Sequence, residues 1–337
     1  MDQAFENLFL YPSKQLVKRF FIKCYAISLT KPLNQNIPFR LGRTSGAWPE
    51  LLIGTIHGLL LFDGETLTKL FAGSIYGISF YRGRWYAFQK LEHKYGSTGR
   101  LVSFKFTGSS VTQIRVEVSN LDPDIHQIDF IGNILFVTDT ANNAIIKYKI
   151  KNHRLIHLKT VWPSGKLANG LKSENYVHLN SVFSHGKSKY IVFHNHTNKT
   201  QRNSEVAVLK DDETVEEIMP TRFACAHNYV LVGDEAYICD SWNRAVYYGE
   251  HKILQCNEFT RGIALTNSQV FIGGSHVVER IKRGHPSLTG KVYRLDANTN
   301  EIVDVLELPG IGNIYEIRVL SEPDFGLTNT LLPKPHK

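Results

Sequence analysis

Short apolar segments that turn back on themselves recur along the chain and predict its architecture. In each copy a polar or aromatic residue opens an apolar strand, a few turn residues follow, and a second strand rich in Val, Ile, Tyr and Phe returns. Such strand pairs, joined by Gly, Asn and Asp turns, are typical of antiparallel hairpins. The copies open at Tyr76, His126, His178, His227, Arg261 and Tyr315.

The spacing of these copies indicates the fold class. Successive openings lie 34 to 54 residues apart, by subtraction of their positions. A four-stranded propeller blade takes about 40–50 residues. We therefore predict an all-β protein, a six-bladed β-propeller built from antiparallel sheets.

The two ends of the chain are predicted to share the last blade. The copy at Tyr315 stops early, whereas Glu50–Gly73 supplies two or three strands without an innermost one. Pairing these segments would close the ring and remove an exposed sheet edge. We assign residues 48–337 to the propeller and residues 1–47 to an N-terminal extension that packs on it. Within the extension, Pro12–Ile27 has a weak helical pattern.

Two predicted blades contain an Asp-x-x-Asn turn between consecutive strands. The turns are formed by Asp139 with Asn142 and by Asp240 with Asn243. Short Asp and Asn side chains readily hydrogen-bond to turn backbone, so we interpret these four residues as structural. The pattern resembles the NHL-type repeat, and this resemblance implies a fold without implying a reaction.

The opening residues of the six copies are the candidate functional site. In a propeller the innermost strands surround a central channel, so their first residues are expected to meet at one mouth. His126, His178 and His227 would then converge, and neutral imidazole is the commonest ligand for zinc, iron or copper. Three protein ligands leave an open position for water or substrate. We predict a divalent metal, zinc or iron(II), bound by these histidines.

Other residues of the ring extend this prediction. Arg261 is a permanent cation suited to a carboxylate or phosphate of the substrate, and Tyr76 and Tyr315 offer phenols for proton transfer or stacking. Further candidates for binding the substrate, or for fixing imidazole tautomers, are Gln127, Asn180, Asn228 and Trp242. The alternative to a metal site is a metal-free polar pocket at the same mouth.

The remaining histidines are assigned less direct roles. His194 and His196 lie in a His-Asn-His segment that we expect to be a loop rather than part of the ligand set. His276 and His285 flank a basic insertion in the fifth blade, which could form a lid over one mouth. His57 is expected to be structural.

Composition and motifs exclude several function classes. The net charge is +8, yet apart from Arg280, Lys282 and Arg283 the basic residues are dispersed, and no nucleic-acid-binding motif accompanies them. No apolar run is long enough for a transmembrane helix. Nucleophile elbow, phosphate-loop, Rossmann and HExxH patterns are missing from the sequence. We expect a small-molecule substrate and neither a nucleic-acid nor a membrane partner.

Cysteine usage suggests a reducing compartment. The four cysteines are scattered and form no CxxC pair, so we expect them to be reduced. The segment Met1–Tyr11 has no basic region before an apolar run, so we expect no secretory leader and a cytoplasmic protein.

The ordered motifs resemble those of a bacterial group of uncharacterised NHL-like propeller proteins. The shared motifs are His126-Gln-Ile, His178-Leu-Asn-Ser-Val, Ala226-His227-Asn, Arg261-Gly-Ile and Tyr315-Glu-Ile-Arg. The group is often associated with polysaccharide or specialised-metabolite gene clusters. The resemblance therefore implies a biosynthetic setting and no particular activity.

A looser resemblance is to the six-bladed peptidyl-α-hydroxyglycine amidating lyase. That enzyme holds a metal with three channel histidines beside an Arg and a Tyr. The resemblance implies that His126, His178 and His227 would bind the metal, with Arg261 and Tyr76 or Tyr315 beside them. In this sequence the histidines come from consecutive rather than alternate blades, which puts the same reaction in doubt.

Two hypotheses from different classes follow. The first is a metal-dependent enzyme that acts on a small polar or anionic substrate, with lyase or hydrolase chemistry first and an iron oxygenase second. The second is a non-catalytic propeller that binds a glycan, peptide or metabolite.

Overall fold

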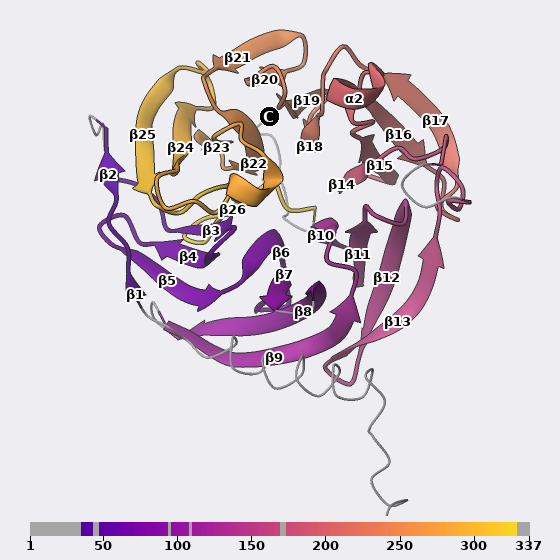
Figure 1. Ribbon diagram of the computed structural model, residues 1–337, viewed down its shortest axis with the longest axis horizontal. Helices are drawn as coiled ribbons and strands as arrows, with labels where there is room; N and C mark the ends of the chain where they lie inside the picture. The colour runs from indigo at the N-terminus through magenta and orange to yellow at the C-terminus, as the bar shows by residue number, and fades with distance from the viewer. Residues whose placement is uncertain (1–34, 43–46, 94–95, 108–109, 169–172, 329–337) are drawn as a thin grey trace, which may run out of the picture.

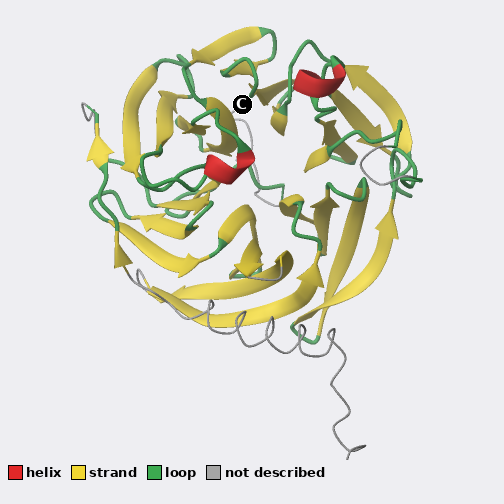
Figure 2. Ribbon diagram, viewed as in Figure 1, coloured by secondary structure: helices red, strands yellow, loops and turns green. Residues whose placement is uncertain are grey.

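Six small sheets stand in a ring around a common axis. The computed structural model describes residues 35–42, 47–93, 96–107, 110–168 and 173–328. Figure 1 shows the chain passing from one sheet to the next in sequence order, and Figure 2 shows that strands make up nearly all of the ring. The predicted all-β, six-bladed β-propeller is confirmed.

Blades I to IV are four-stranded antiparallel meanders whose first strand lies innermost. Blade I contains β6 (Ser74–Tyr81), β7 (Arg84–His93), β8 (Gly96–Thr107) and β9 (Ser110–Leu121). Blade II contains β10 (Ile125–Ile131), β11 (Ile134–Asp139), β12 (Ala144–Lys151) and β13 (Arg154–Val161). Blade III contains β14 (Leu179–His185), β15 (Ser188–Phe193), β16 (Glu205–Leu209) and β17 (Val215–Pro220). Blade IV contains β18 (His227–Val232), β19 (Glu235–Asp240), β20 (Ala245–Tyr248) and β21 (His251–Gln255).

Blades V and VI each include a strand from the N-terminal part of the chain. Blade V contains β22 (Phe259–Leu265), β23 (Gln269–Ser275), β24 (Thr289–Asp296), β25 (Ile302–Pro309) and, at its outer edge, β2 (Arg40–Leu41). Blade VI contains β26 (Ile314–Val319), β3 (Leu51–Thr55), β4 (Gly58–Phe62), β5 (Leu67–Ala72) and, at its outer edge, β1 (Gln35–Asn36).

Blade VI joins the two ends of the chain as the sequence predicts. The C-terminal strand β26 is innermost and pairs antiparallel with β3, with Ile317 opposite Ile53. The ring is thus closed by main-chain hydrogen bonds, and the inner strand of this blade has a partner. Of the proposed extension, residues 35–42 and 47 are described, and residues 35–42 supply β1 and β2. The helical pattern at Pro12–Ile27 lies outside the described residues.

The hydrophobic core is divided into clusters between neighbouring blades. Phe62 of blade VI packs with Phe271 of blade V, and Phe88 of blade I packs with Phe130 of blade II. Comparable clusters lie between the other neighbours. Burying one such side chain contributes roughly 1.5–3 kcal/mol, so the packing between blades fixes the ring as a rigid frame.

Every innermost strand carries a β-bulge near its start. A bulge inserts one extra residue and redirects the local side chains, which makes it a common feature beside functional sites. The face of the ring at which the inner strands begin is called the upper face below, and the opposite face the lower face. The bulged residues are Tyr76, His126–Gln127, Asn180, Asn228, Arg261–Gly262 and Tyr315.

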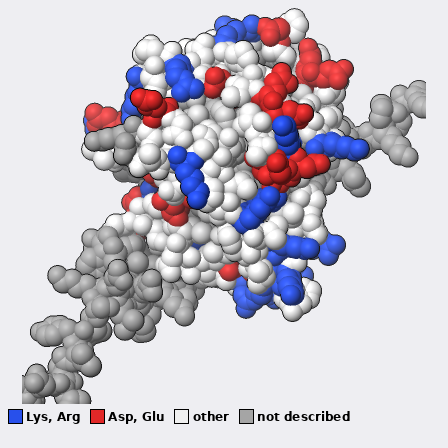
Figure 3. All heavy atoms as spheres, turned by 90° about the vertical axis from the view of Figure 1, so that its right-hand side faces the viewer, with Lys and Arg blue, Asp and Glu red and all other residues white. Residues whose placement is uncertain are grey.

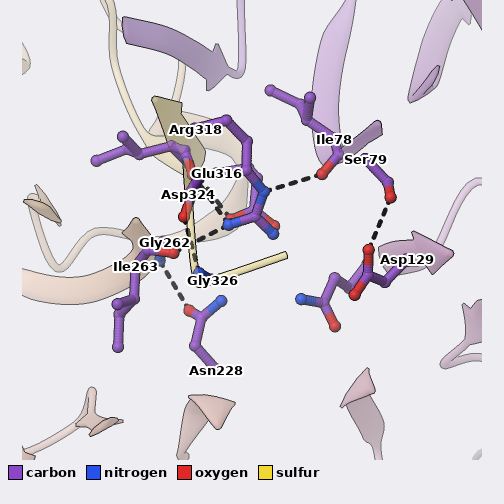
Figure 4. Close-up of polar contacts among 12 residues, drawn as sticks. Ile78, Ser79, Asp129, Asn228, Gly262, Ile263, Glu316, Arg318, Asp324 and Gly326 are labelled. Carbon is purple, nitrogen blue, oxygen red and sulfur yellow. Dashed lines mark hydrogen bonds and ion pairs between the residues drawn. The ribbon is translucent and has the colours of Figure 1, made fainter. Parts of the chain in front are cut away.

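The lower part of the axis is closed by the chain itself. Buried Arg318 donates from Nε to Ile78 O (3.0 Å) and from Nη1 to Ile263 O (2.9 Å), and Nη1 lies 3.3 Å from Glu316 Oε1. The segment after β26 then crosses below, where the Asp324 carboxylate accepts backbone N–H groups from Leu265, Val319 and Gly326. Figure 4 shows these groups meeting from several blades.

The outer surface carries charges of both signs. On the side shown in Figure 3, basic and acidic side chains are interspersed. Within the described ranges, no helix is long and apolar enough to span a bilayer.

Candidate metal site at the upper face

His126 of blade II is held in one tautomer by a hydroxyl group. Its Nδ1 lies 2.5 Å from Thr140 Oγ1, and that hydroxyl donates to Leu179 O of blade III at 2.5 Å. Because the hydroxyl proton is used on the carbonyl, Thr140 accepts from the imidazole, so Nδ1 carries the proton. The Nε2 lone pair of His126 is therefore left for another partner.

His227 of blade IV repeats this arrangement. Its Nδ1 lies 2.9 Å from both Cys225 O and Ser241 Oγ, and the Ser241 hydroxyl donates to Thr260 O of blade V at 2.6 Å. A carbonyl can only accept, so Nδ1 again carries the proton and Nε2 keeps its lone pair. Thr140 and Ser241 each follow the Asp of an Asp-x-x-Asn turn, so the same turn positions the imidazole in two blades.

These turns also confirm the structural interpretation of their acidic residues. The Asn142 side-chain amide donates to both Asp139 oxygens at 3.0 Å, and Asn243 donates to both Asp240 oxygens at 3.1 and 3.0 Å. The Asp and Asn side chains therefore brace each turn, and the hydroxyl between them faces the histidine.

Blade III contributes a compact group of three histidines. Each of His178, His194 and His196 offers a ring nitrogen, and these nitrogens lie within 4.8 Å of one another. His178 Nδ1 is 2.5 Å from His196 Nε2 and 2.8 Å from the Tyr176 hydroxyl, while the backbone N–H of His196 donates to His194 Nδ1 at 3.1 Å. Residues 178 and 196 have positive φ angles of 50° and 49°, which turn the chain sharply on either side of the group.

The five imidazoles form one continuous cluster. Ring centroids are 4.8 Å apart for His126 and His178, 4.4 Å for His178 and His194, and 4.9 Å for His194 and His227. The three histidines predicted from the repeat therefore do meet at one face of the ring. His194 and His196, which we expected to be loop residues, join them.

The register of His178 corrects the sequence alignment. His126, Asn180 and His227 each lie five residues before the last residue of their strands, Ile131, His185 and Val232. By this register Asn180 is the equivalent of His126 and His227 in blade III, and His178 precedes it by two residues. His178 reaches the cluster because its left-handed backbone redirects the side chain, not because it shares the repeat position.

His194 and His196 could have been identified from the blade order. They follow the second strand of blade III, as Thr140 follows that of blade II and Ser241 that of blade IV. Connections from second to third strands lie at the upper face, beside the starts of the inner strands. A histidine pair in this connection therefore faces the same site as the ring residues.

Burial keeps the cluster uncharged. Burial first, and neighbouring positive or imidazole groups second, lower the pKa of His126, His178, His194 and His227 well below the usual value. Burial and Lys199 lower the pKa of His196 to about 4. Neutral imidazoles have a lone pair for a metal at physiological pH, so the protonation state fits the proposed ligands.

Arg261, Tyr76 and Tyr315 form a second group next to His126. The tyrosine rings stack at 4.1 Å, and the Arg261 guanidinium carbon lies 5.4 Å from the Tyr76 ring centre and 5.1 Å from that of Tyr315. Arg261 Nη2 donates to the backbone carbonyl of His126 at 3.2 Å. The structure therefore brings the predicted cation and phenols beside the histidines.

The predicted amide residues have different surroundings. Gln127 Oε1 accepts Val182 N–H at 2.7 Å and Asn228 Oδ1 accepts Gly262 N–H at 2.8 Å, so both oxygens join neighbouring blades. Asn180 is buried, and its Nδ2 has no hydrogen-bond partner among the described residues. Trp242 lies in a turn of blade IV and is 44% exposed.

The predicted lid is the connection between β23 and β24, residues 276–288. Its short helix η2 (Arg280–Lys282) lies near the centre of the ring in Figures 1 and 2. Arg280 pairs with Asp124 at the start of blade II, and His57 Nε2 lies 2.8 Å from Gly284 O. The segment thus extends from blade V to blades II and VI, and His57 has the structural role that we expected.

Comparisons with known proteins support the fold. No protein-family model matches the chain, and no curated protein matches it. A chain of the nidogen/laminin complex aligns with a TM-score of 0.58 at 12% identity, over 82% of this chain and all of that one. A functionally unknown protein from Desulfotomaculum acetoxidans aligns with a TM-score of 0.51 at 12% identity, over 87% of this chain and 93% of that one.

A third structure belongs to a proposed 6-phosphogluconolactonase from Bacteroides uniformis. It aligns with a TM-score of 0.49 at 12% identity, over 76% of this chain and 81% of that one. At 12% identity, the first two alignments show a shared fold alone. The chain is similar in architecture to other propellers, and its chemistry has to be argued from the histidine cluster.

Proposed function

We propose that this protein is a metal-dependent enzyme that binds zinc or iron(II) at the five-histidine cluster and acts on a small polar or anionic substrate. The observation that carries the proposal is the convergence of neutral imidazoles from three blades. Among them, His126 and His227 have tautomers fixed by hydroxyl groups. Fixed tautomers with free Nε2 atoms are characteristic of histidines that ligate metals.

The ligand set is proposed to include His178. The compact set His178, His194 and His196 is the first candidate, because its nitrogens already lie within 4.8 Å of one another. The alternative set is His126, His178 and His227. The hydrogen bonds at Nδ1 of His126 and His227 leave the Nε2 lone pairs of these two residues for a metal. Both sets consist of three neutral nitrogens, which suits zinc and iron(II) and leaves positions for water or substrate.

The surrounding residues supply contacts that bind the substrate. When bound, the metal would provide Lewis-acid activation of a water molecule or of a substrate oxygen. Arg261 would hold an anionic group of the substrate through its fixed fork of donors. Burial, reinforced by Tyr76, raises the pKa of Tyr315 well above its usual value, so its hydroxyl stays protonated and would donate a hydrogen bond to a substrate oxygen.

The reaction class proposed first is lyase or hydrolase chemistry, with an iron oxygenase second. Neither class needs a nucleotide-binding motif, and no such motif occurs in the sequence. The resemblance to NHL-like bacterial propellers adds a biosynthetic setting to the proposal.

Metal analysis of the purified protein tests the proposal. After reconstitution with zinc or iron(II), we expect about one ion per chain, lost in His178→Ala and retained in His251→Ala, an exposed control on β21. Loss in the double variant of His194 and His196, but not in that of His126 and His227, would identify the compact set. A content below about 0.2 ion per chain in the wild type would overturn the proposal.

Ligand-binding and turnover assays on the same protein distinguish the rival function, a non-catalytic binding module. The buried Nδ2 of Asn180 and the buried hydroxyl of Tyr315 form no hydrogen bond with the described residues. Such groups favour a bound ligand whether or not a metal is present. Unchanged ligand affinity after chelation, together with no turnover of a hydrolase and lyase substrate panel in the metal-loaded protein, would favour the binding module.

A further inference from the structure

Arg261 is a buried cation without a counter-ion. It is 7% exposed and donates a hydrogen bond to the His126 carbonyl, while no ion pair joins it to an acid among the described residues. Burying an unpaired charge is costly, and native proteins normally supply a partner. The flanking Tyr76 and Tyr315 rings offset part of this cost through cation–π contact.

Tyr315 presents a second unsatisfied donor at the same place. The residue is 2% exposed, and its hydroxyl interacts with Tyr76 of the stacked pair but forms no hydrogen bond of good geometry with the described residues. Buried hydroxyl groups are nearly always bonded, so a missing acceptor points to a ligand. Because Arg261 lies over the same ring, both donors face one region.

Arg283 is a further cation, in the lid segment directly after its short helix. This half-buried residue lies between two anchors of the segment, the Arg280–Asp124 ion pair and the His57–Gly284 hydrogen bond. Its side chain forms no ion pair with a described residue. Burial and Tyr76 raise the pKa of Tyr315, and the positive charges of Arg283 and Arg261 oppose this rise.

The acids closest to this region are already engaged. Asp124 is bonded to Arg280 and also lies 3.8 Å from Lys90, and Glu316 is paired with Arg318 at 3.3 Å. Both carboxylates therefore already have a cation of their own, and Glu316 acts on Arg261 only through space, without an ion-pair contact. A ligand that brings oxygen acceptors and negative charge would satisfy all three unpartnered groups.

We propose that Arg261, the Tyr315 hydroxyl and Arg283 of the lid form a subsite for an oxyanion of the substrate, a carboxylate or a phosphate. The subsite deepens the proposed function, since it adjoins His126 and would orient the substrate toward the histidine cluster. Arg261 and Tyr315 form its wall and Arg283 its roof, with the Arg280–Asp124 pair holding the lid across the upper face. Arg guanidinium groups fit both oxyanions through paired N–H donors.

The test uses the full chain after treatment with a chelator, so that it does not depend on the metal. Inorganic phosphate and acetate, titrated separately by calorimetry at low ionic strength, represent the two sources of the oxyanion. We expect wild-type protein to bind at least one of them, and Arg283→Gln to weaken that binding about 10- to 100-fold, as for loss of a charge-assisted hydrogen bond. Preference for one probe assigns the source.

Lys282→Gln is the matched control, because it removes the same charge from the same turn. Lys282 pairs with Glu279 at 3.0 Å and is exposed, so its replacement is expected to change affinity less than twofold. Tyr315→Phe, which keeps the stacked ring and removes only the hydroxyl, is expected to weaken binding about 5- to 10-fold.

Two outcomes would overturn the subsite: no binding of either probe by the wild type, or equal losses in Arg283→Gln and Lys282→Gln. Metal binding without oxyanion binding would remove the subsite and leave the proposed function intact. Oxyanion binding without metal binding would retain the subsite and overturn the proposed metal-dependent function.

Discussion

The upper and lower faces of the ring both bury polar and charged groups, but they satisfy them differently. Below, Arg318 is bonded to carbonyls from two other blades and paired with Glu316, and Asp324 accepts three backbone N–H groups. One nitrogen of Arg318, Nη2, has no hydrogen-bond partner among the described residues, but the side chain is held by the other contacts and by its ion pair. Above, Arg261 donates to one backbone carbonyl and forms no ion pair with a described acid, and the Tyr315 hydroxyl forms no hydrogen bond with a described residue. A buried polar group whose partners come from its own chain serves the fold, and one without partners indicates a ligand.

The largest expected effect is on stability at the lower face. Arg318→Leu would leave Glu316 and Asp324 buried without their cation and should lower the free energy of unfolding by about 3–5 kcal/mol. Arg261→Leu should change it by less than about 1 kcal/mol, because it removes a cation that has no counter-ion. Urea denaturation measures both, and equal losses would contradict the distinction between the two faces.

Metal binding should stabilise the upper face. At a free metal concentration about 100 times the dissociation constant, binding to the folded state alone adds about 2.7 kcal/mol to the free energy of unfolding. The melting temperature should therefore rise on reconstitution and fall on chelation. His178→Ala should abolish the rise and exposed His251→Ala should retain it. A rise that persists in His178→Ala would place the metal elsewhere.

The hydroxyl groups that orient His126 and His227 should tune metal affinity. Thr140→Val removes the acceptor of the His126 Nδ1–H, and loss of such a partner typically weakens metal binding 10- to 100-fold, or about 1.4–2.7 kcal/mol. Ser241→Ala should have a smaller effect, because the Cys225 carbonyl remains as an acceptor for His227. Competition with a chromophoric chelator measures the constant. Unchanged affinity in both variants would favour the compact His178, His194 and His196 set, which these hydroxyl groups do not contact.

The smallest effect concerns pH. Burial and His196 lower the pKa of His194 well below its usual 6.5, so the folded state binds fewer protons there than the unfolded chain. The stability from neutral His194 is complete above pH 6.5 and is lost as the pH falls below that value. In metal-free protein, His194→Gln should flatten this loss by up to about 1.4 kcal/mol per pH unit.

The lower face should respond to pH in the opposite sense. Burial raises the pKa of Glu316 to about 7 and raises the pKa of Asp129 and Asp324, so acidification relieves the cost of burying these carboxylates. Comparing each variant with wild type over the same pH range separates the two contributions. A His194→Gln profile that is parallel to that of the wild type would contradict the prediction for the upper face.

The sequence by itself determined the blades, their closure and the general position of the site. Repeats of apolar strands with short turns predict hairpins, because strand alternation and turn chemistry are local properties. The incomplete copy at Tyr315 predicted its pairing with Glu50–Gly73, and the repeat placed His126, His227 and Arg261 on one face.

Only the tertiary structure decided which side chains complete the site. His178 reaches the cluster through a left-handed backbone two residues before the repeat position, which spacing alone cannot show. His194 and His196 join from a connection whose path depends on the packing of blade III against its neighbours. The lid depends on contacts of Arg280 with Asp124 and of His57 with Gly284, between residues far apart in the sequence. Such contacts follow from how the blades pack into a ring, because local preferences do not encode the distance between segments.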